Sequence, residues 1–319
     1  MRRLRLLPVA AGLFAGGAFA ATDSVYPNKP IRMLASGVGG GGDFAARVIA
    51  QGLIASWGQQ VVVDNRPAGV IPGQIVANAA PDGYTLLVTG SILWIGTFMY
   101  NNVPYDPVRD FVPVTLAVSS PSVLVVPSTV NANSVGDLIK LARSKPGEFN
   151  YATAGTGSSM HLAGELFKAM AGVHIVRVNY KGGGAALNDL LSSQVQIAFG
   201  SVASVSPHVK TGRLKALAVT SLRPSALFPE LPTIAASGVP GYESVVTSGI
   251  FAPAKTPGAV VQRLNKEIIR VLALPDVKDK FFNSGVETVG TTPEEFASRI
   301  RAEMARLGKV IREAGIRAE

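Results

Sequence analysis

The sequence predicts an α/β fold divided into two lobes, and three observations support this. The chain has 319 residues, of which 47% are hydrophobic and 16% charged, so it can bury a large core. Short apolar runs alternate with segments of helical spacing, as in proteins whose sheets are covered by helices. This alternation occurs in two series, one in each half of the chain, so we expect two lobes.

The first series contains one long helix among several strands. A helix is expected over residues 43–57, because Phe44, Val48 and Leu53 fall on one side of it. A Pro-Asp-Gly turn at 81–83 precedes the third strand, which ends in a small polar loop. The strand-like runs are residues 31–36, 60–64, 84–89, 112–118 and 122–127.

The second series begins with a capped helix over residues 134–145. The Ser134 hydroxyl is its expected cap, with Asp137 at the reciprocal position. Residues 242–254 form a mostly apolar run that we expect to pass back between the lobes. The other strands are 150–154, 174–180, 195–201 and 214–221, and the other helices are 160–172, 185–194, 257–272 and 291–315, with a helix or turn at 205–213.

The N-terminus has the composition of a secretory signal peptide. Arg2, Arg3 and Arg5 precede a stretch without charge, and Ala18-Phe19-Ala20 is a small-x-small cleavage site. We therefore expect residues 1–20 to be removed near Ala20-Ala21 and the protein to be periplasmic. The chain contains no cysteine, so its stability must come from its core and not from disulfides.

The net charge disfavours one class of partner. The formal charge of +9 falls to +6 without the three arginines of the signal peptide, and the remaining charges are of mixed sign. No basic stripe alternates with aromatic residues, so we expect no nucleic-acid partner. A mild positive charge is compatible with a small anionic ligand.

Three loops share one layout, in which a strand leads through glycine and hydroxyl residues into a helix. They are residues 37–43, 154–159 and 181–184. The first turn of a helix has unpaired N–H groups and the positive end of the helix dipole, and glycine lets an anion approach the backbone closely. Each loop is therefore a candidate anion cradle, and together they suggest a ligand held between two lobes.

The first loop also permits a different interpretation. Gly37, Gly39 and Gly42 match the dinucleotide pattern G-x-G-x-x-G, and Asp64 follows at the distance of a ribose-binding acid. An exported protein does not normally meet a pool of dinucleotide, so we favour a structural role for Asp64 in its own turn. No loop has the G-x-x-x-x-G-K-[ST] pattern of nucleoside-triphosphate sites.

Catalysis and metal binding find little support. The three histidines, His161, His174 and His208, have no metal-ligand spacing, and there is no G-x-S-x-G elbow. Ser158 and His161 could be a nucleophile and its base, but we expect His161 to bond locally and support its loop. We predict no catalytic residue, metal or cofactor. Instead of binding a ligand, Asp43 could interact with the dipole of its helix. Lys181 could likewise be a solvated loop lysine.

The chain resembles the Bug/TctC family of extracytoplasmic solute receptors. The similarity covers essentially all of the mature chain, and the order and spacing of its motifs carry it. In the first half these are YPNKPIR, GGGGDFAARVIA, VVVDNRPAG, PDGYTLL and PYDPVRDFVPV. In the second half they are YATAGTGSSMHLAGELF, VNYKGGGAAL, GRLKALAVTS, LPTIAASGVPGYE and TPEEFASRIRAE.

The resemblance implies a type II periplasmic binding fold, or Venus flytrap, with a hinge between its lobes. We expect lobe one to combine residues 22–124 and 250–319, and lobe two to be residues 125–249. The expected ligand is a small organic carboxylate held by backbone and hydroxyl groups. The residues expected to bind it are Gly39, Gly40, Gly41, Gly42, Asp43, Thr89, Ser91, Gly155, Thr156, Gly157, Ser158, Ser159, His161, Lys181, Gly182, Gly200 and Ser201.

Two departures from the family pattern bear on the ligand. Ser36-Gly37-Val38 stands where many members have a Pro-Phe-Pro-like stretch, and Gly200-Ser201 where many have an acid. An aromatic wall is therefore not expected, and an amino-acid ligand is disfavoured.

The resemblance implies a receptor that delivers its solute to the permease subunits of a tripartite tricarboxylate transporter, and we expect it to be a monomer. A ligand sensor for a signalling receptor and a dinucleotide-dependent oxidoreductase are the alternatives.

Overall fold

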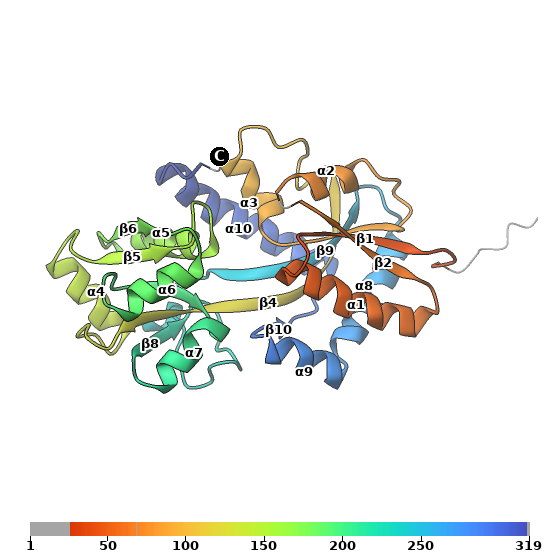
Figure 1. The fold of residues 1–319 in the computed structure, drawn as a ribbon. Helices are drawn as coiled ribbons and strands as arrows, with labels where there is room; N and C mark the ends of the chain where they lie inside the picture. Colours follow the sequence, from red (N-terminus) through yellow and green to blue (C-terminus); the bar gives the residue numbers. More distant parts are fainter. Residues whose placement is uncertain (1–25, 68, 318–319) are drawn as a thin grey trace, which may run out of the picture.

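Two lobes lie side by side in the computed structural model, which describes residues 26–67 and 69–317 (Figure 1). The predicted signal peptide, residues 1–20, lies outside the described residues. Strands and helices alternate along the chain in both lobes, as the sequence predicts.

The first lobe is built on a mixed sheet with strand order β10-β4-β9-β3-β1-β2. Strand β1 pairs in parallel with β2 and β3, while β9 runs antiparallel to β3 and β4. The strands are β1 (Ile31–Ser36), β2 (Val61–Arg66), β3 (Thr85–Thr89), β4 (Phe111–Pro127), β9 (Val245–Pro253) and β10 (Glu287–Thr288).

Helices cover both faces of this sheet. One face packs against α1 (Gly41–Trp57), α8 (Gly258–Leu272) and α9 (Pro275–Asn283). The other packs against α2 (Ile71–Ala77), α3 (Ile92–Met99) and α10 (Pro293–Glu313). Since the strands are buried on two sides, their sequences are continuous apolar runs and do not alternate between apolar and polar residues.

The second lobe continues from the far end of β4. Its strands are β5 (Asn150–Thr153), β6 (Val176–Asn179), β7 (Ala198–Ser201) and β8 (Leu214–Val219). Strands β7 and β8 pair with β4, and β5 pairs with β6. The helices are α4 (Val135–Ser144), α5 (Ser159–Ala171), α6 (Gly183–Leu191) and α7 (Val202–Lys210), with a short 3₁₀ turn at Ala235–Ser237.

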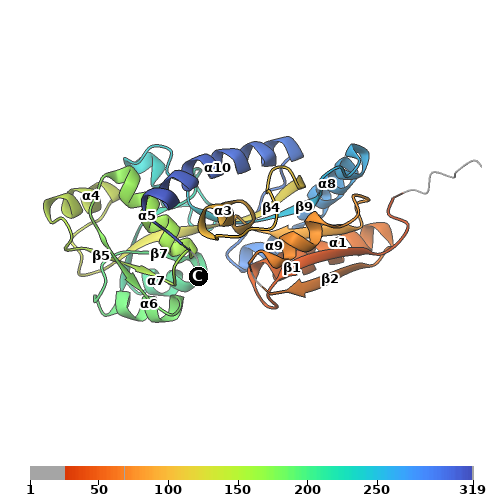
Figure 2. The same cartoon turned by 90° about the horizontal axis from the view of Figure 1, so that it is seen from above.

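Strands β4 and β9 connect the two lobes (Figure 2). The sequence predicted two strands where β4 is one strand of 17 residues. The prediction was wrong because Ser119–Ser122, with Pro121 among them, interrupt the apolar pattern. These residues lie where β4 exchanges β9 for β7 as its partner. The predicted lobe boundaries fall inside β4 and β9, which run through both lobes. The division of the chain into lobes at these residues therefore stays a prediction.

Helix α3 was missed in the sequence, because an apolar segment of eight residues has no polar face to reveal its period. Its Trp94 is 1% exposed and packs against Phe251 of β9 and Phe296 of α10. Helix α10 begins with a complete capping box between Thr292 and Glu295. Its later turns contact α5, so the last long helix touches both lobes.

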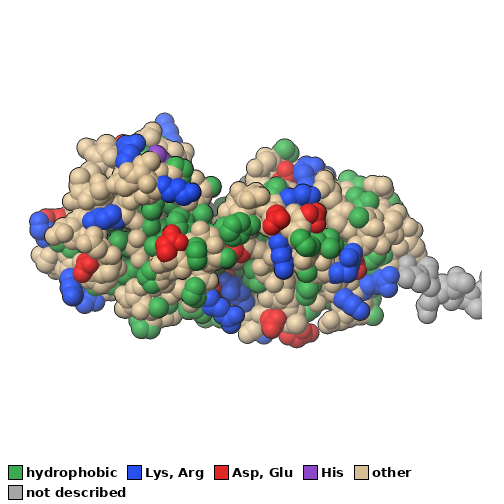
Figure 3. Space-filling model, turned by 90° about the horizontal axis from the view of Figure 1, so that it is seen from below, with side chains coloured by type: hydrophobic (Ala, Val, Ile, Leu, Met, Phe, Trp, Pro, Cys, Tyr) green, Lys and Arg blue, Asp and Glu red, His purple; other side chains and the backbone are tan. Residues whose placement is uncertain are grey.

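Charges of both signs are interspersed on the face seen in Figure 3, where the outline narrows between the two lobes. Within residues 26–67 and 69–317, no helix combines the length and the apolar character needed to cross a bilayer.

Candidate functional site

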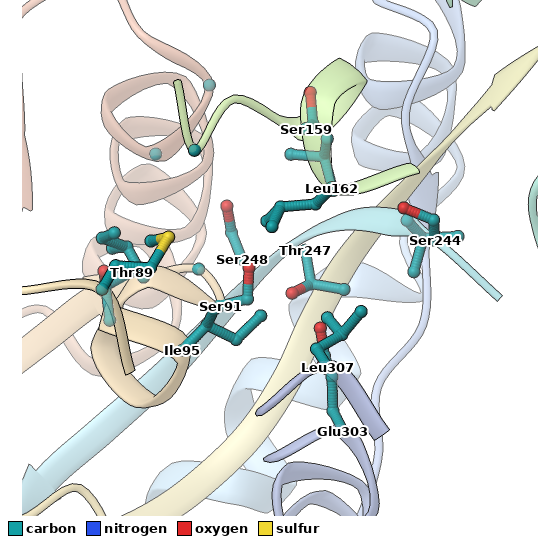
Figure 4. A pocket seen from close by; sticks show the side chains of 18 residues that line it. Thr89, Ser91, Ile95, Ser159, Leu162, Ser244, Thr247, Ser248, Glu303 and Leu307 are labelled. Carbon is teal, nitrogen blue, oxygen red and sulfur yellow. The ribbon is translucent and has the colours of Figure 1, made fainter. Parts of the chain in front are cut away.

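A cavity of about 300 Å³ opens where the two lobes meet, and we call it the cleft cavity. Three helices begin at its wall: α1 and α3 in the first lobe and α5 in the second. The lining residues are Gly41, Gly42, Thr89, Gly90, Ser91, Ile92, Ile95, Met99, Gly157, Ser159, Leu162, Ser244–Ser248, Glu303 and Leu307. Figure 4 shows how the labelled side chains converge on this space.

The start of α1 presents backbone amides to the cleft cavity. Gly40 is the residue before the helix, and the first intrahelical bond runs from the Phe44 N–H to its carbonyl. The amides of Gly41 and Gly42 therefore have no helical acceptor. A Cβ atom at Gly41 would meet nothing within 4 Å, so the space in front of the backbone is open.

Asp43 holds the glycine loop before α1 and does not line the cavity. Its carboxylate accepts from the Gly39 N–H at 2.9 Å and from the Asn65 amide at 2.9 Å, and it pairs with Arg47 at 2.8 Å. The bond from Arg47, followed by the Gly39 bond, lowers the pKa of Asp43 to about 2. Asp43 is 4% exposed and its carboxylate is fully engaged by these donors, so it fixes the loop.

The start of α5 repeats this arrangement in the second lobe. The Ser158 hydroxyl caps the helix by accepting from the His161 N–H at 3.3 Å. The His161 ring reaches back in turn, and its Nδ1 accepts from the Gly157 N–H at 3.0 Å. Burial, and then the charge of Arg177, lower the pKa of His161 to about 4. The ring is therefore neutral at pH 7, as an acceptor must be.

The loop between β3 and α3 closes the first-lobe side of the cleft cavity. Gly90 lies so near β9 that a Cβ atom there would be 2.4 Å from the Thr247 carbonyl oxygen. Only glycine permits this approach. It brings Thr89 and Ser91 to the cavity beside the amides of α1.

The opposite wall is formed by β9 and α10. In Figure 4, Thr247 lies on β9 in the middle of the view, and Glu303 reaches toward it from α10. Burial raises the pKa of the Glu303 carboxyl above its usual range. Leu307 of α10 gives this wall an apolar surface, and Ile95 of α3 adds a second apolar side chain to the cavity lining.

A second cavity of about 340 Å³ adjoins the first inside the second lobe, and we call it the side cavity. Ser159 and Val246 line both. The starts of α5, α6 and α7 contribute Ser159, Gly183 and Gly184, and Ser201. Its remaining lining is mostly apolar and includes Met160, Leu187, Leu190, Ala198 and Val205.

The family model described as "Tripartite tricarboxylate transporter family receptor" matches residues 45–316. The chain belongs to this receptor family. It is 40% identical to a UPF0065 protein in the tcbD-tcbE intergenic region of Pseudomonas sp. (strain P51), over 99% of this chain and 96% of that one. It is 36% identical to protein BugT of Bordetella pertussis (strain Tohama I), over 99% of each chain.

Among solved structures, the R. palustris protein Rpa4515 with adipate matches with a TM-score of 0.71 and 35% identity. The match covers 92% of this chain and 99% of that one. The type II fold expected from the sequence is therefore confirmed. The protein is a periplasmic solute-binding receptor and not an enzyme, which excludes the oxidoreductase interpretation.

The structure brings only part of the predicted receptor site to these two cavities. Gly41, Gly42, Thr89, Ser91, Gly157 and Ser159 line the cleft cavity, and Ser159, Gly200 and Ser201 line the side cavity. Thr156 and His161 line a separate cavity with Glu165, Lys168 and Arg177. The remaining predicted residues line neither the cleft cavity nor the side cavity, and they lie in the loops and first helical turns beside them. They are Gly39, Gly40, Asp43, Gly155, Ser158, Lys181 and Gly182.

Sequence reasoning missed residues from α3, α5, the β9 segment and α10 that line the cleft cavity. The missed residues include Ile95, Leu162, Ser244, Thr247, Ser248, Glu303 and Leu307. The run over 242–254 was expected to pass between the lobes, and its serine and threonine residues within an apolar strand were a usable signal. Glu303 lies in a long amphipathic helix, where nothing in the sequence distinguishes it from solvated glutamates.

The residues considered for other chemistry have local partners. Asp64 is bound by Arg32 of β1 and, at 3.0 Å, by Arg66. Its role is structural, as favoured in the sequence, but it lies within strand β2 and not in a turn. In the described part of the chain, no three histidine, aspartate or glutamate side chains are grouped as metal ligands would be.

Proposed function

We propose that this receptor captures a small organic carboxylate in the cleft cavity and delivers it to the membrane subunits of a tripartite tricarboxylate-type transporter. The observation that carries the proposal is the convergence of α1 from one lobe and α5 from the other on the same space. Helix starts and hydroxyl groups favour an anion there. No lysine, arginine or histidine is among the cavity's lining residues, so the expected contacts are amides and hydroxyls.

The adipate in the similar R. palustris structure supports a carboxylate as the ligand class. A hydrogen bond to a charged group contributes roughly 1.5–3 kcal/mol net. Several such bonds, less the cost of association, correspond to a dissociation constant of about a micromolar. We expect a monomer, because the site is complete within one chain.

The test is calorimetric titration of the mature protein with mono-, di- and tricarboxylates, using Gly41→Asp as the disabling variant. The new carboxylate would occupy open space at the first residue of α1. An acid suits a helix start, so folding is preserved while an anionic ligand is repelled. We expect affinity for the best carboxylate to fall at least about thirtyfold, equivalent to about 2 kcal/mol.

The matched control is Gly258→Asp. Gly258 is also the first residue of a long helix, has open space for a Cβ atom, and lines neither cavity. It should bind like the wild type. Unchanged carboxylate affinity in Gly41→Asp would contradict the proposed cradle. Deleting the gene then separates delivery from sensing: loss of uptake supports transport, and loss of induction with intact uptake supports a sensor.

A further inference from the structure

Two buried polar side chains face the cleft cavity from the wall opposite α1. Thr247 is 4% exposed, and its Oγ1 has no hydrogen-bond partner among the described residues. Glu303 is 7% exposed and forms no ion pair within the described part of the chain. A buried polar group without a partner costs free energy, so the unpaired Thr247 hydroxyl indicates that a bound molecule supplies its missing partner.

The indole of Trp94 does not fill this role. It lies beside the Glu303 carboxyl and opposes the rise in its pKa. Its Nε1 nevertheless lies outside hydrogen-bonding geometry with any described residue. The wall formed by Thr247 and Glu303, which we call the acceptor floor, therefore retains free hydrogen-bonding capacity toward the cavity.

The two walls of the cavity differ in what they offer a ligand. The wall of α1 and α5 presents N–H donors and hydroxyls, which suit a carboxylate. The acceptor floor presents a carboxyl group, which repels a second carboxylate placed against it when the group is ionised. A complementary ligand thus has a carboxylate at one end and a hydrogen-bond donor at the other.

The charges around Glu303 distinguish between a neutral and a cationic donor. Arg299 and Arg306 are close enough to act on the Glu303 carboxyl, and both also contact Glu243, at 2.8 and 3.5 Å. The two arginines and the Glu243 carboxylate act on Glu303 together, so an ammonium group at the floor meets a net positive charge beside the carboxyl group. A hydroxyl group carries no net charge, and it donates to a carboxyl group in either protonation state.

We propose that Thr247 and Glu303 are specificity-determining residues that select a carboxylate bearing a hydroxyl group. This inference rests on the proposed function, because the carboxylate end must occupy the amide wall.

The experiment measures affinities for pairs of carboxylates that differ by a single hydroxyl group. The pairs contain three to seven carbons, aliphatic and aromatic, and each pair is accompanied by its amino analogue. Calorimetry gives the ratio of dissociation constants within each pair. We expect the best hydroxy acid to bind about tenfold tighter than its deoxy analogue, the value of one good hydrogen bond.

Three variants assign the preference to the floor. Thr247→Val and Glu303→Met remove the polar groups at similar volume, and each should bring the ratio within about twofold of one. Glu303→Gln keeps hydrogen bonding without ionisation and should retain the preference. Thr256→Val is the control, because Thr256 is a buried threonine that bonds to the Pro253 carbonyl and lines neither cavity.

The outcomes separate this inference from the proposed function. If carboxylates bind but the hydroxyl preference is missing, or survives both Thr247→Val and Glu303→Met, the acceptor floor is refuted while the cradle stands. If amino analogues bind best and Glu303→Gln abolishes that preference, the floor is an ammonium site and the hydroxyl assignment is wrong. If no carboxylate of the panel binds, the proposed function fails and this inference fails with it.

Discussion

At the scale of single residues, the two lobes use the same device to hold their ligand-facing loops. Asp43 and His161 each occupy the third position of a helix, and each accepts from a glycine N–H four residues earlier. Those glycines, Gly39 and Gly157, have φ of 79° and 75°, a conformation that other residues rarely adopt. The side chains that support the loops thus differ from the amides that we expect to bind.

His161 should make the stability of the protein depend on pH. Its pKa of about 4 in the folded state lies below the ordinary histidine value of 6.5, so between pH 4 and 6.5 the unfolded chain binds the extra proton. Stability then rises with pH through this window and is lost as pH falls. We expect His161→Gln to reduce the slope of unfolding free energy against pH by about 1 kcal/mol per unit.

Urea unfolding at half-unit steps from pH 4 to 7.5 measures this slope. His208→Gln is the control, and it should keep the steep segment because His161 is still present. An unchanged slope in His161→Gln would mean that the ring is not held neutral by its burial.

Some site residues were predictable because their role is local. The cap at Ser158 and the support by His161 follow from residue type and position in a few consecutive residues. The acceptor floor was not predictable, since Thr247 and Glu303 meet only after β9 and α10 have packed on the same sheet. Burial of one glutamate in an amphipathic helix depends on that packing and leaves no local signal.

At the scale of elements, the connection between the lobes depends on close packing against β9. A Cβ atom on Gly249 would lie 2.2 Å from the Phe296 ring and 3.2 Å from the Thr115 carbonyl. The strand, the ring and the backbone of β4 thus leave no room for a methyl group. The long strands themselves were foreseeable as apolar runs, but the continuity of β4 through Pro121 was not, because it depends on a change of partner.

We predict that Gly249→Ala lowers the free energy of unfolding by roughly 1–3 kcal/mol, the usual cost of overpacking. Chemical denaturation measures the free energies of unfolding of Gly249→Ala and of the control Gly258→Ala. The Cβ atom of the control meets nothing within 4 Å. Equal stability of the two variants would show that Phe296 moves aside without cost.

At the scale of the whole molecule, the lobes share their hydrophobic core. One buried cluster runs from Trp94 and Phe296 in the first lobe to Tyr151 and Phe167 in the second. Only the closed form lets both lobes contact one ligand, so binding should shift the population toward closure. The two-lobed plan followed from the double series of strands and helices, whereas the contact of α10 with both lobes did not.

Ligand-driven closure should be visible in solution. We predict that the radius of gyration from small-angle X-ray scattering falls as the best carboxylate is added, and that Gly41→Asp shows no fall at the same concentration. Thermal stability should rise in parallel, by about 2.7 kcal/mol at a ligand concentration of 100 times Kd. Binding with an unchanged radius would contradict a closing motion.

The position of Trp94 should make the intrinsic fluorescence of the protein sensitive to ligand binding. The chain has two tryptophans, and the other, Trp57, packs against Tyr26 at the far end of α1. Because the Trp94 indole borders the Glu303 carboxyl, an occupied cavity changes the field and polarity that set its emission. In a Trp57→Phe background, the fluorescence of a single residue then follows solute capture without any added label.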